Sequence, residues 1–115
     1  MINTRNKGSR TRLKLMKELR ERGYICEIVE RIGNTYGPKD LFNRFDIIAI
    51  STTESMLIQV TCNRPHNHAK YESFGKTYAN CGIRFYQYVW MDRKGWKIFR
   101  YDIDGKWKVQ DIVGS

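Results

Sequence analysis

Two apolar stretches decide the fold, Phe45–Ser51 (FDIIAIS) and Met56–Cys62 (MLIQVTC), with the polar Thr52–Ser55 (TTES) between them. Each stretch is nearly continuous in apolar residues, which is typical of a strand buried on both faces. The polar segment between them predicts a tight turn. Together they predict an antiparallel hairpin in the middle of a sheet.

Polar residues interrupt this hairpin at three positions. Asp46 begins the first strand, and Gln59 and Thr61 lie two residues apart on the second, so their side chains are expected on one face. A buried strand has no packing use for an aspartate, whose charge must be paired, hydrogen-bonded or bound to a metal. The alternative is that Asp46 lies at the strand end and caps a neighbouring turn.

Helices are predicted on both sides of the hairpin in the sequence. The first begins at Ser9 or Thr11 and continues through Arg22, with Gly23 after its last turn. The second begins at Pro65 and ends at about residue 79.

The remaining segments predict further strands. They are Tyr24–Glu30, Ile83–Met91 and Trp96–Ile103, with turns at Gly33–Lys39 and Asp92–Gly95 and a short strand or docked tail at Trp107–Val109. The order α-β-β-β-α-β-β predicts an α/β fold, a mixed central β-sheet that contains the antiparallel hairpin and is flanked by helices.

The 115 residues leave room for one hydrophobic core. We expect a flexible basic N-terminus over residues 1–8 and a single domain over residues 9–115. Lys and Arg number 21 against 12 Asp and Glu, a net charge of +9. This surplus suits a polyanionic partner, because each phosphate contact releases a condensed counterion.

Three widely spaced cysteines, Cys26, Cys62 and Cys81, are interpreted as reduced thiols of a cytoplasmic protein, since no secretory segment is seen. No apolar run approaches the roughly 20 residues of a membrane span. The spacing C-x3-H-x-H from Cys62 to His68 fits no common zinc site, so zinc is not expected.

The order of these elements resembles the PD-(D/E)xK nuclease superfamily, and within it small Holliday-junction-resolvase-like proteins. Lys7–Tyr24 looks like the first helix of archaeal resolvases. Asp40–Ile50 with Gln59-Val60-Thr61 is similar to a phage- and prophage-associated branch in which glutamine takes the usual acidic position, and the Trp90–Trp96 hairpin also fits that branch. The resemblance spans residues 7–100 and implies a restriction-endonuclease-like fold.

The resemblance also implies an activity, hydrolysis of DNA by a metal-dependent endonuclease that acts on branched or junction DNA during recombination. In the superfamily, an aspartate and an acidic residue hold Mg²⁺ or Mn²⁺, and a lysine orients the attacking water. By position, Asp46 corresponds to the metal aspartate, whereas Gln59 replaces the acidic ligand and Thr61 the lysine. Arg12 stands where resolvases have a glutamate in their first helix.

Two interpretations therefore stay open. In the first the site is active, with Asp40 and Glu30 as further metal ligands beside Asp46 and Gln59, and with Lys70 as the catalytic cation. In the second, cleavage has been lost, and the chain is a catalytically inactive DNA-binding or architectural protein.

Basic residues are expected to contact DNA phosphates on both sides of the pocket. They are Lys7, Arg10, Arg12, Lys14, Lys39, Arg44 and Arg64. Phosphate contacts position a protein without reading sequence, so binding is expected to select DNA structure. The aromatic strand Phe85–Trp90 is interpreted as core, with a homodimer interface and base stacking as alternatives.

Overall fold

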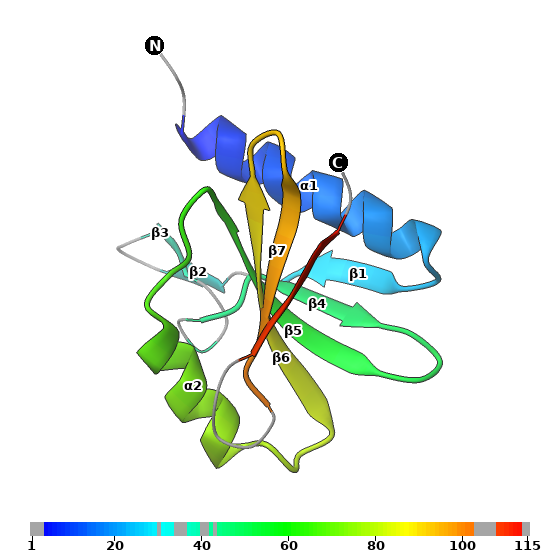
Figure 1. The fold of residues 1–115 in the computed structure, drawn as a ribbon, viewed down its shortest axis with the longest axis vertical. Coiled ribbons are helices and arrows are strands. Elements are labelled where there is room, and N and C mark those ends of the chain that lie inside the picture. Colours follow the sequence, from blue (N-terminus) through cyan, green and yellow to red (C-terminus); the bar gives the residue numbers. More distant parts are fainter. Residues whose placement is uncertain are drawn as a thin grey trace.

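The structure, a computed structural model, describes residues 4–29, 31–33, 37–39, 42, 44–102 and 108–113, and the side chains of residues 10–29, 42 and 44–102. Its elements in chain order are α1 (Thr4–Glu21), β1 (Ile25–Ile28), β2 (Arg31–Gly33), β3 (Gly37–Lys39), β4 (Ile47–Ile50), β5 (Ser55–Cys62), α2 (His68–Thr77), β6 (Ile83–Met91), β7 (Gly95–Arg100) and β8 (Lys108–Val113). Figure 1 shows them along the chain.

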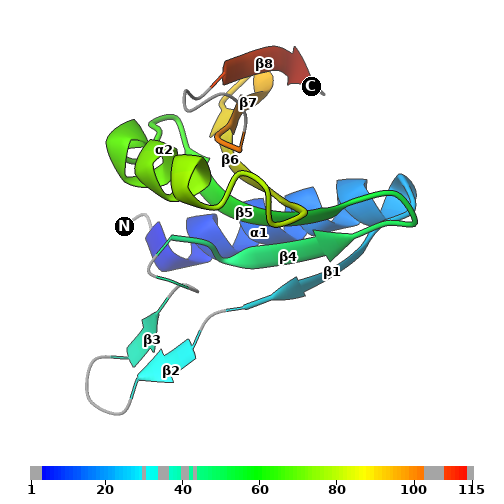
Figure 2. The same cartoon turned by 90° about the horizontal axis from the view of Figure 1, so that it is seen from below.

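Six strands form one mixed sheet in the order β1-β4-β5-β6-β7-β8. β5 and β6 are parallel and are joined by α2 as a crossover, whereas the other neighbours are antiparallel. The two helices cover opposite faces of this sheet (Figure 2). The α/β fold with a central antiparallel hairpin is therefore confirmed.

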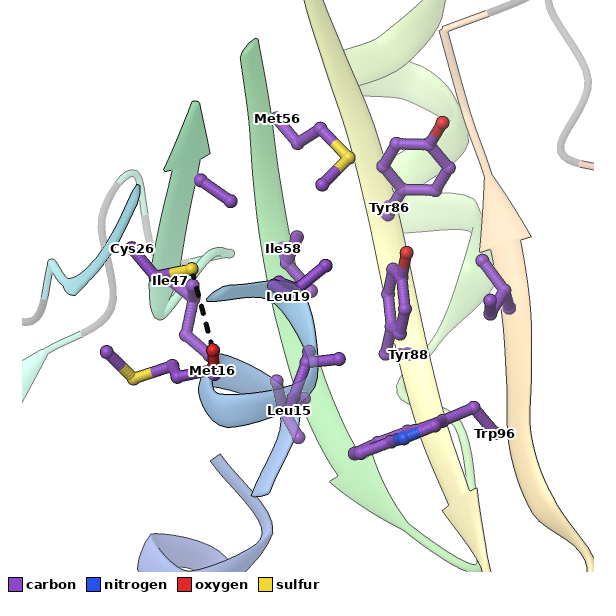
Figure 3. Packing of buried hydrophobic residues seen from close by; sticks show 13 residues of the cluster. Leu15, Met16, Leu19, Cys26, Ile47, Met56, Ile58, Tyr86, Tyr88 and Trp96 are labelled. Atoms are coloured by element: carbon purple, nitrogen blue, oxygen red, sulfur yellow. Dashed lines mark hydrogen bonds between the residues drawn. The ribbon is translucent and has the colours of Figure 1, made fainter. Parts of the chain in front are cut away.

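Alternation along the strands divides the core into two clusters. Leu15, Met16 and Leu19 of α1 pack against residues such as Ile58 and Tyr88 on one face (Figure 3). The other cluster lies beneath α2 and is largely aromatic. It contains Phe45, Leu57, Tyr71, Phe85, Val89, Phe99 and Tyr101. The core interpretation of the aromatic strand is confirmed, since Phe85, Tyr86 and Tyr88 are at most 7% exposed.

The first helix begins at Thr4, so neither Ser9 nor Thr11 is its N-cap. Glycine and serine lower helix propensity but do not end a helix when good helix formers surround them. The second helix begins at His68 because Asn67 is the cap, with its side-chain oxygen accepting from Ala69 N at 3.0 Å. Pro65 belongs to the preceding loop.

Two strand predictions needed revision, and the open choice between a strand and a docked tail at the end of the chain is decided for the strand. The predicted turn Gly33–Lys39 contains the last residue of β2 and all of β3. These two short strands pair antiparallel, with Ile32 opposite Pro38. The last segment is a strand, β8, which pairs with β7. The strand through Ile50 is not buried on both faces, because Ile50 is 39% exposed. In the part of the chain that the structure describes, no helix is long and apolar enough to cross a membrane.

Candidate functional site around Asp46

Asp46 lies at the start of β4 and is 2% exposed. Its backbone N donates to Ile58 O at 3.0 Å, and its carbonyl accepts from Val29 N at 3.0 Å. Its side-chain Oδ1 accepts from Val60 N at 3.2 Å. The carboxylate thus accepts a hydrogen bond from a buried backbone amide of β5, which needs an acceptor, and not from a turn.

The other carboxylate oxygen of Asp46 faces α1. Arg12 Nη1 lies 3.6 Å from Asp46 Oδ2, and the two side chains are 22% and 3% exposed. A contact between Thr11 Oγ1 and Cys62 Sγ at 3.0 Å fixes this turn of α1 against the end of β5. Arg12 was expected among the phosphate-binding residues, but its guanidinium pairs with the buried charge of Asp46.

Gln59 and Thr61 lie on the face of β5 that turns toward α2, since Ile58 and Val60 pack on the α1 face. Gln59 Nε2 donates to Val60 O at 3.3 Å. Gln59 Oε1 and Thr61 Oγ1 are both buried and have no hydrogen-bond partner among the described residues. Buried oxygens are rarely left unpaired, so these two atoms mark a place that accepts a donor or a cation.

A chain of hydrogen-bonded polar groups begins at Gln87 on β6, the strand beside β5. Gln87 is paired with Gln59 in the register of β5 and β6 and is fully buried. Its Oε1 accepts from His66 N, and its Nε2 donates to Tyr101 Oη at 2.8 Å. Sequence reasoning missed this role, although a glutamine inside the apolar run of β6 was a usable signal.

The chain ends at His68 on the first turn of α2. Tyr101 Oη lies 2.7 Å from His68 Nδ1, and the His68 ring lies 4.5 Å from that of Phe99. Burial raises the pKa of Tyr101, so its hydroxyl stays neutral in this hydrogen-bonded position. Burial, helped by Lys97, lowers the pKa of His68. A neutral His68 thus anchors α2 to the sheet.

Arg44 also has a structural role. Its Nε donates to Lys70 O at 3.2 Å and its Nη1 to Phe42 O at 2.9 Å. The guanidinium lies 4.9 Å from the centre of the Phe74 ring. Arg44, expected to contact phosphate, therefore fastens its loop to α2.

The other predicted residues have different positions. Lys70 is exposed on α2, and Arg10, Lys14 and Arg64 are exposed as well. Lys14 Nζ lies 4.6 Å from the centre of the Trp90 ring. Glu30 and Asp40 lie outside the described residues, as do the side chains of Lys7 and Lys39; their roles stay predictions.

The described residues do not fit Mg²⁺ or Mn²⁺. Hard dications are held by several oxygens, among them charged carboxylates. Here one carboxylate is available, and Arg12 already neutralises it, beside two neutral oxygens. Among the described residues, no group of three His, Cys, Asp or Glu side chains is arranged to hold a metal ion. A dication beside Asp46 would also be repelled by the Arg12 guanidinium.

No protein-family model matches the sequence, and no curated protein matches it. A solved structure of Hjc, a Holliday junction resolvase from the archaeal hyperthermophile Archaeoglobus fulgidus, is similar with a TM-score of 0.61 at 20% identity. The match covers 90% of this chain and 88% of that one. The chain therefore has the fold of this resolvase, a restriction-endonuclease-like fold. The fold that the sequence predicted is confirmed, whereas membership of the phage-associated branch stays a prediction.

Proposed function

We propose that this chain binds branched DNA, such as a four-way junction, and does not cut it. The observation that carries the proposal is the Arg12 guanidinium, 3.6 Å from the buried carboxylate of Asp46. The neighbour with the same fold is, by its name, a Holliday junction resolvase. The net charge of +9 supports a polyanionic partner.

Cleavage by this fold needs a base or a metal-bound hydroxide, and the described residues at the site supply neither. A guanidinium stays protonated at any physiological pH, so Arg12 is not a base. Gln59 is neutral, and the Thr61 hydroxyl does not carry the permanent charge of a lysine. Arg12 instead holds a permanent positive charge 3.6 Å from the Asp46 carboxylate, where a nuclease of this kind would need a metal ion.

The basic side chains that remain for DNA gather at one end of the sheet. One turn of α1 contacts β4 through Arg12, β5 through Thr11 and β6 through Lys14, whose ammonium lies over Trp90. Arg64 follows β5 at the same end and is exposed. This arrangement presents several cations to one stretch of phosphate backbone, without groups that read bases.

Binding to a labelled four-way junction, measured by fluorescence anisotropy, is expected to weaken about tenfold for each doubling of salt, as about four phosphate contacts would require. Replacing Mg²⁺ by EDTA at constant ionic strength should leave the affinity unchanged. Arg64→Gln is expected to reduce the salt dependence, whereas Lys76→Gln in the last turn of α2 serves as the matched control. An affinity that does not respond to salt contradicts the proposal.

A metal-dependent endonuclease is the second candidate, and the unpartnered Gln59 Oε1 and Thr61 Oγ1 favour it. Oxygen atoms are the ligands of hard cations. In that function Arg12 leaves Asp46 when the metal binds, and Glu30, Asp40 and Lys70 complete the site. Mg²⁺ or Mn²⁺ then raises the melting temperature of wild type but not of Asp46→Asn. A homodimer would supply two such sites to the two symmetric strands of a junction.

A further inference from the structure

The hairpin between β6 and β7 places an arginine where the backbone favours glycine. Arg93 has φ +68° in the three-residue turn between Met91 and Gly95, and Lys94 N donates to Met91 O at 2.9 Å. This left-handed region is strained for a long L side chain, and glycine or asparagine adopts it more readily. The Arg93 side chain is exposed, so packing does not explain it. Strain of this kind at an exposed residue is a sign of function.

The same hairpin is fixed to the loop that follows β5. Asn63 Nδ2 donates to Asp92 Oδ2 at 2.9 Å, and Asp92 N donates to Asn63 Oδ1 at 2.9 Å. Asn63 N also donates to Trp90 O at 2.7 Å. These bonds join the residues that precede Arg64 and Arg93. The two exposed cations therefore extend from loops whose positions are already fixed.

The two joined loops lie at the end of the sheet that carries the Arg12–Asp46 pair. Cys62 is paired with Trp90 in the register of β5 and β6, and each contacts α1, Cys62 through Thr11 and Trp90 through Lys14. In Figure 1 the tip of the hairpin and α1 lie at this same end. Because neighbouring strands are about 5 Å apart, β6 and β7 lie about 10 Å and about 15 Å from β4 across the sheet, within reach of one DNA backbone.

We propose that Arg93 is a phosphate ligand and that the β6–β7 hairpin is a second DNA contact beside α1. This inference rests on the proposed DNA-binding function. The guanidinium can hold two oxygens of one phosphate, and the charge of Asp92 is directed toward Asn63 by their hydrogen bonds. On this proposal Arg93 binds DNA and does not help the hairpin to fold.

The test is Arg93→Gly, which removes the charge and relieves the backbone together. The melting temperature is expected to stay the same or rise, while affinity for the four-way junction falls about fivefold and the slope of log Kd against log salt decreases by about one. Arg93→Asn, which also suits positive φ, is expected to give the same loss of affinity. Lys76→Gln is the charge-matched control at the far end of α2 and should change neither quantity.

The outcomes separate the two proposals. If wild type binds the junction and Arg93→Gly binds it equally well, the hairpin inference is wrong and the DNA-binding function stands. If Arg93→Gly lowers the melting temperature, the arginine is structural and the inference is also wrong. If wild type does not bind any DNA, the proposed function fails, and the hairpin contact with it.

Discussion

Gly75→Ala is expected to destabilise the protein by about 3 kcal/mol, the upper part of the range for overpacked sites. A Cβ at Gly75 would stand 2.1 Å from Tyr101 O and 2.6 Å from Tyr101 C, and these are backbone atoms that no rotamer change can move. Tyr101 is itself fixed, because its N donates to Phe85 O at 2.9 Å and its ring is fully buried. The only remedy is for α2 to move away from the sheet.

Urea denaturation followed by tryptophan fluorescence measures this effect. Ser73→Ala is the matched control, an exposed position in the same helix, where a change within about 0.5 kcal/mol is expected. A Gly75→Ala protein as stable as wild type would show that α2 does not pack on Tyr101 in this way.

Asp46→Ala is expected to destabilise the protein by about 3 kcal/mol, from the loss of a buried acceptor and of a charge partner. The Val60 amide loses the oxygen it now reaches at 3.2 Å, and Arg12 loses the anion 3.6 Å away. Asp46→Asn should give about half of this loss, because the amide oxygen still accepts from Val60 N while the charge is gone.

The sign of the Asp46→Asn effect tests whether Arg12 holds the Asp46 carboxylate in the free protein, the contact that carries the binding proposal. In an empty metal site, clustered carboxylates repel one another, so neutralising one of them stabilises the fold in EDTA. Here the carboxylate is paired with Arg12, so the same substitution destabilises it. A double-mutant cycle with Arg12→Gln should give a favourable coupling of about 1 kcal/mol. An Asp46→Asn protein that is more stable than wild type in EDTA would favour the metal-dependent nuclease.

The central hairpin could be predicted from sequence because its signals are local. Apolar strand residues on both sides of a polar turn are read directly from the chain, and so is the presence of Asp46 where packing offers it no use. The partner of Asp46 could not be predicted in this way. Arg12 comes from another element, and only the packing of α1 on the sheet brings the two together. Its place in a run of basic residues suggested a phosphate contact, and only the resemblance to resolvases set it at the position of a glutamate near the site.

Gly75 and the start of α1 illustrate the same limit. A glycine inside a helix signals only a modest loss of helix propensity, whereas its real constraint is the approach of Tyr101 from a distant segment. Ser9 after Gly8 is typical of the residue that caps the start of a helix, although α1 continues through both residues. Local patterns predicted which elements form, while close tertiary contacts decided what individual residues do.

The most direct test of the account is to incubate wild type and Asp46→Asn with an end-labelled four-way junction in Mg²⁺ or Mn²⁺, and to analyse each reaction on native and denaturing gels. We expect a retarded complex with wild type and no cut strand with either protein in either metal. Strand cleavage by wild type that is absent with Asp46→Asn would contradict it and establish a nuclease at Asp46.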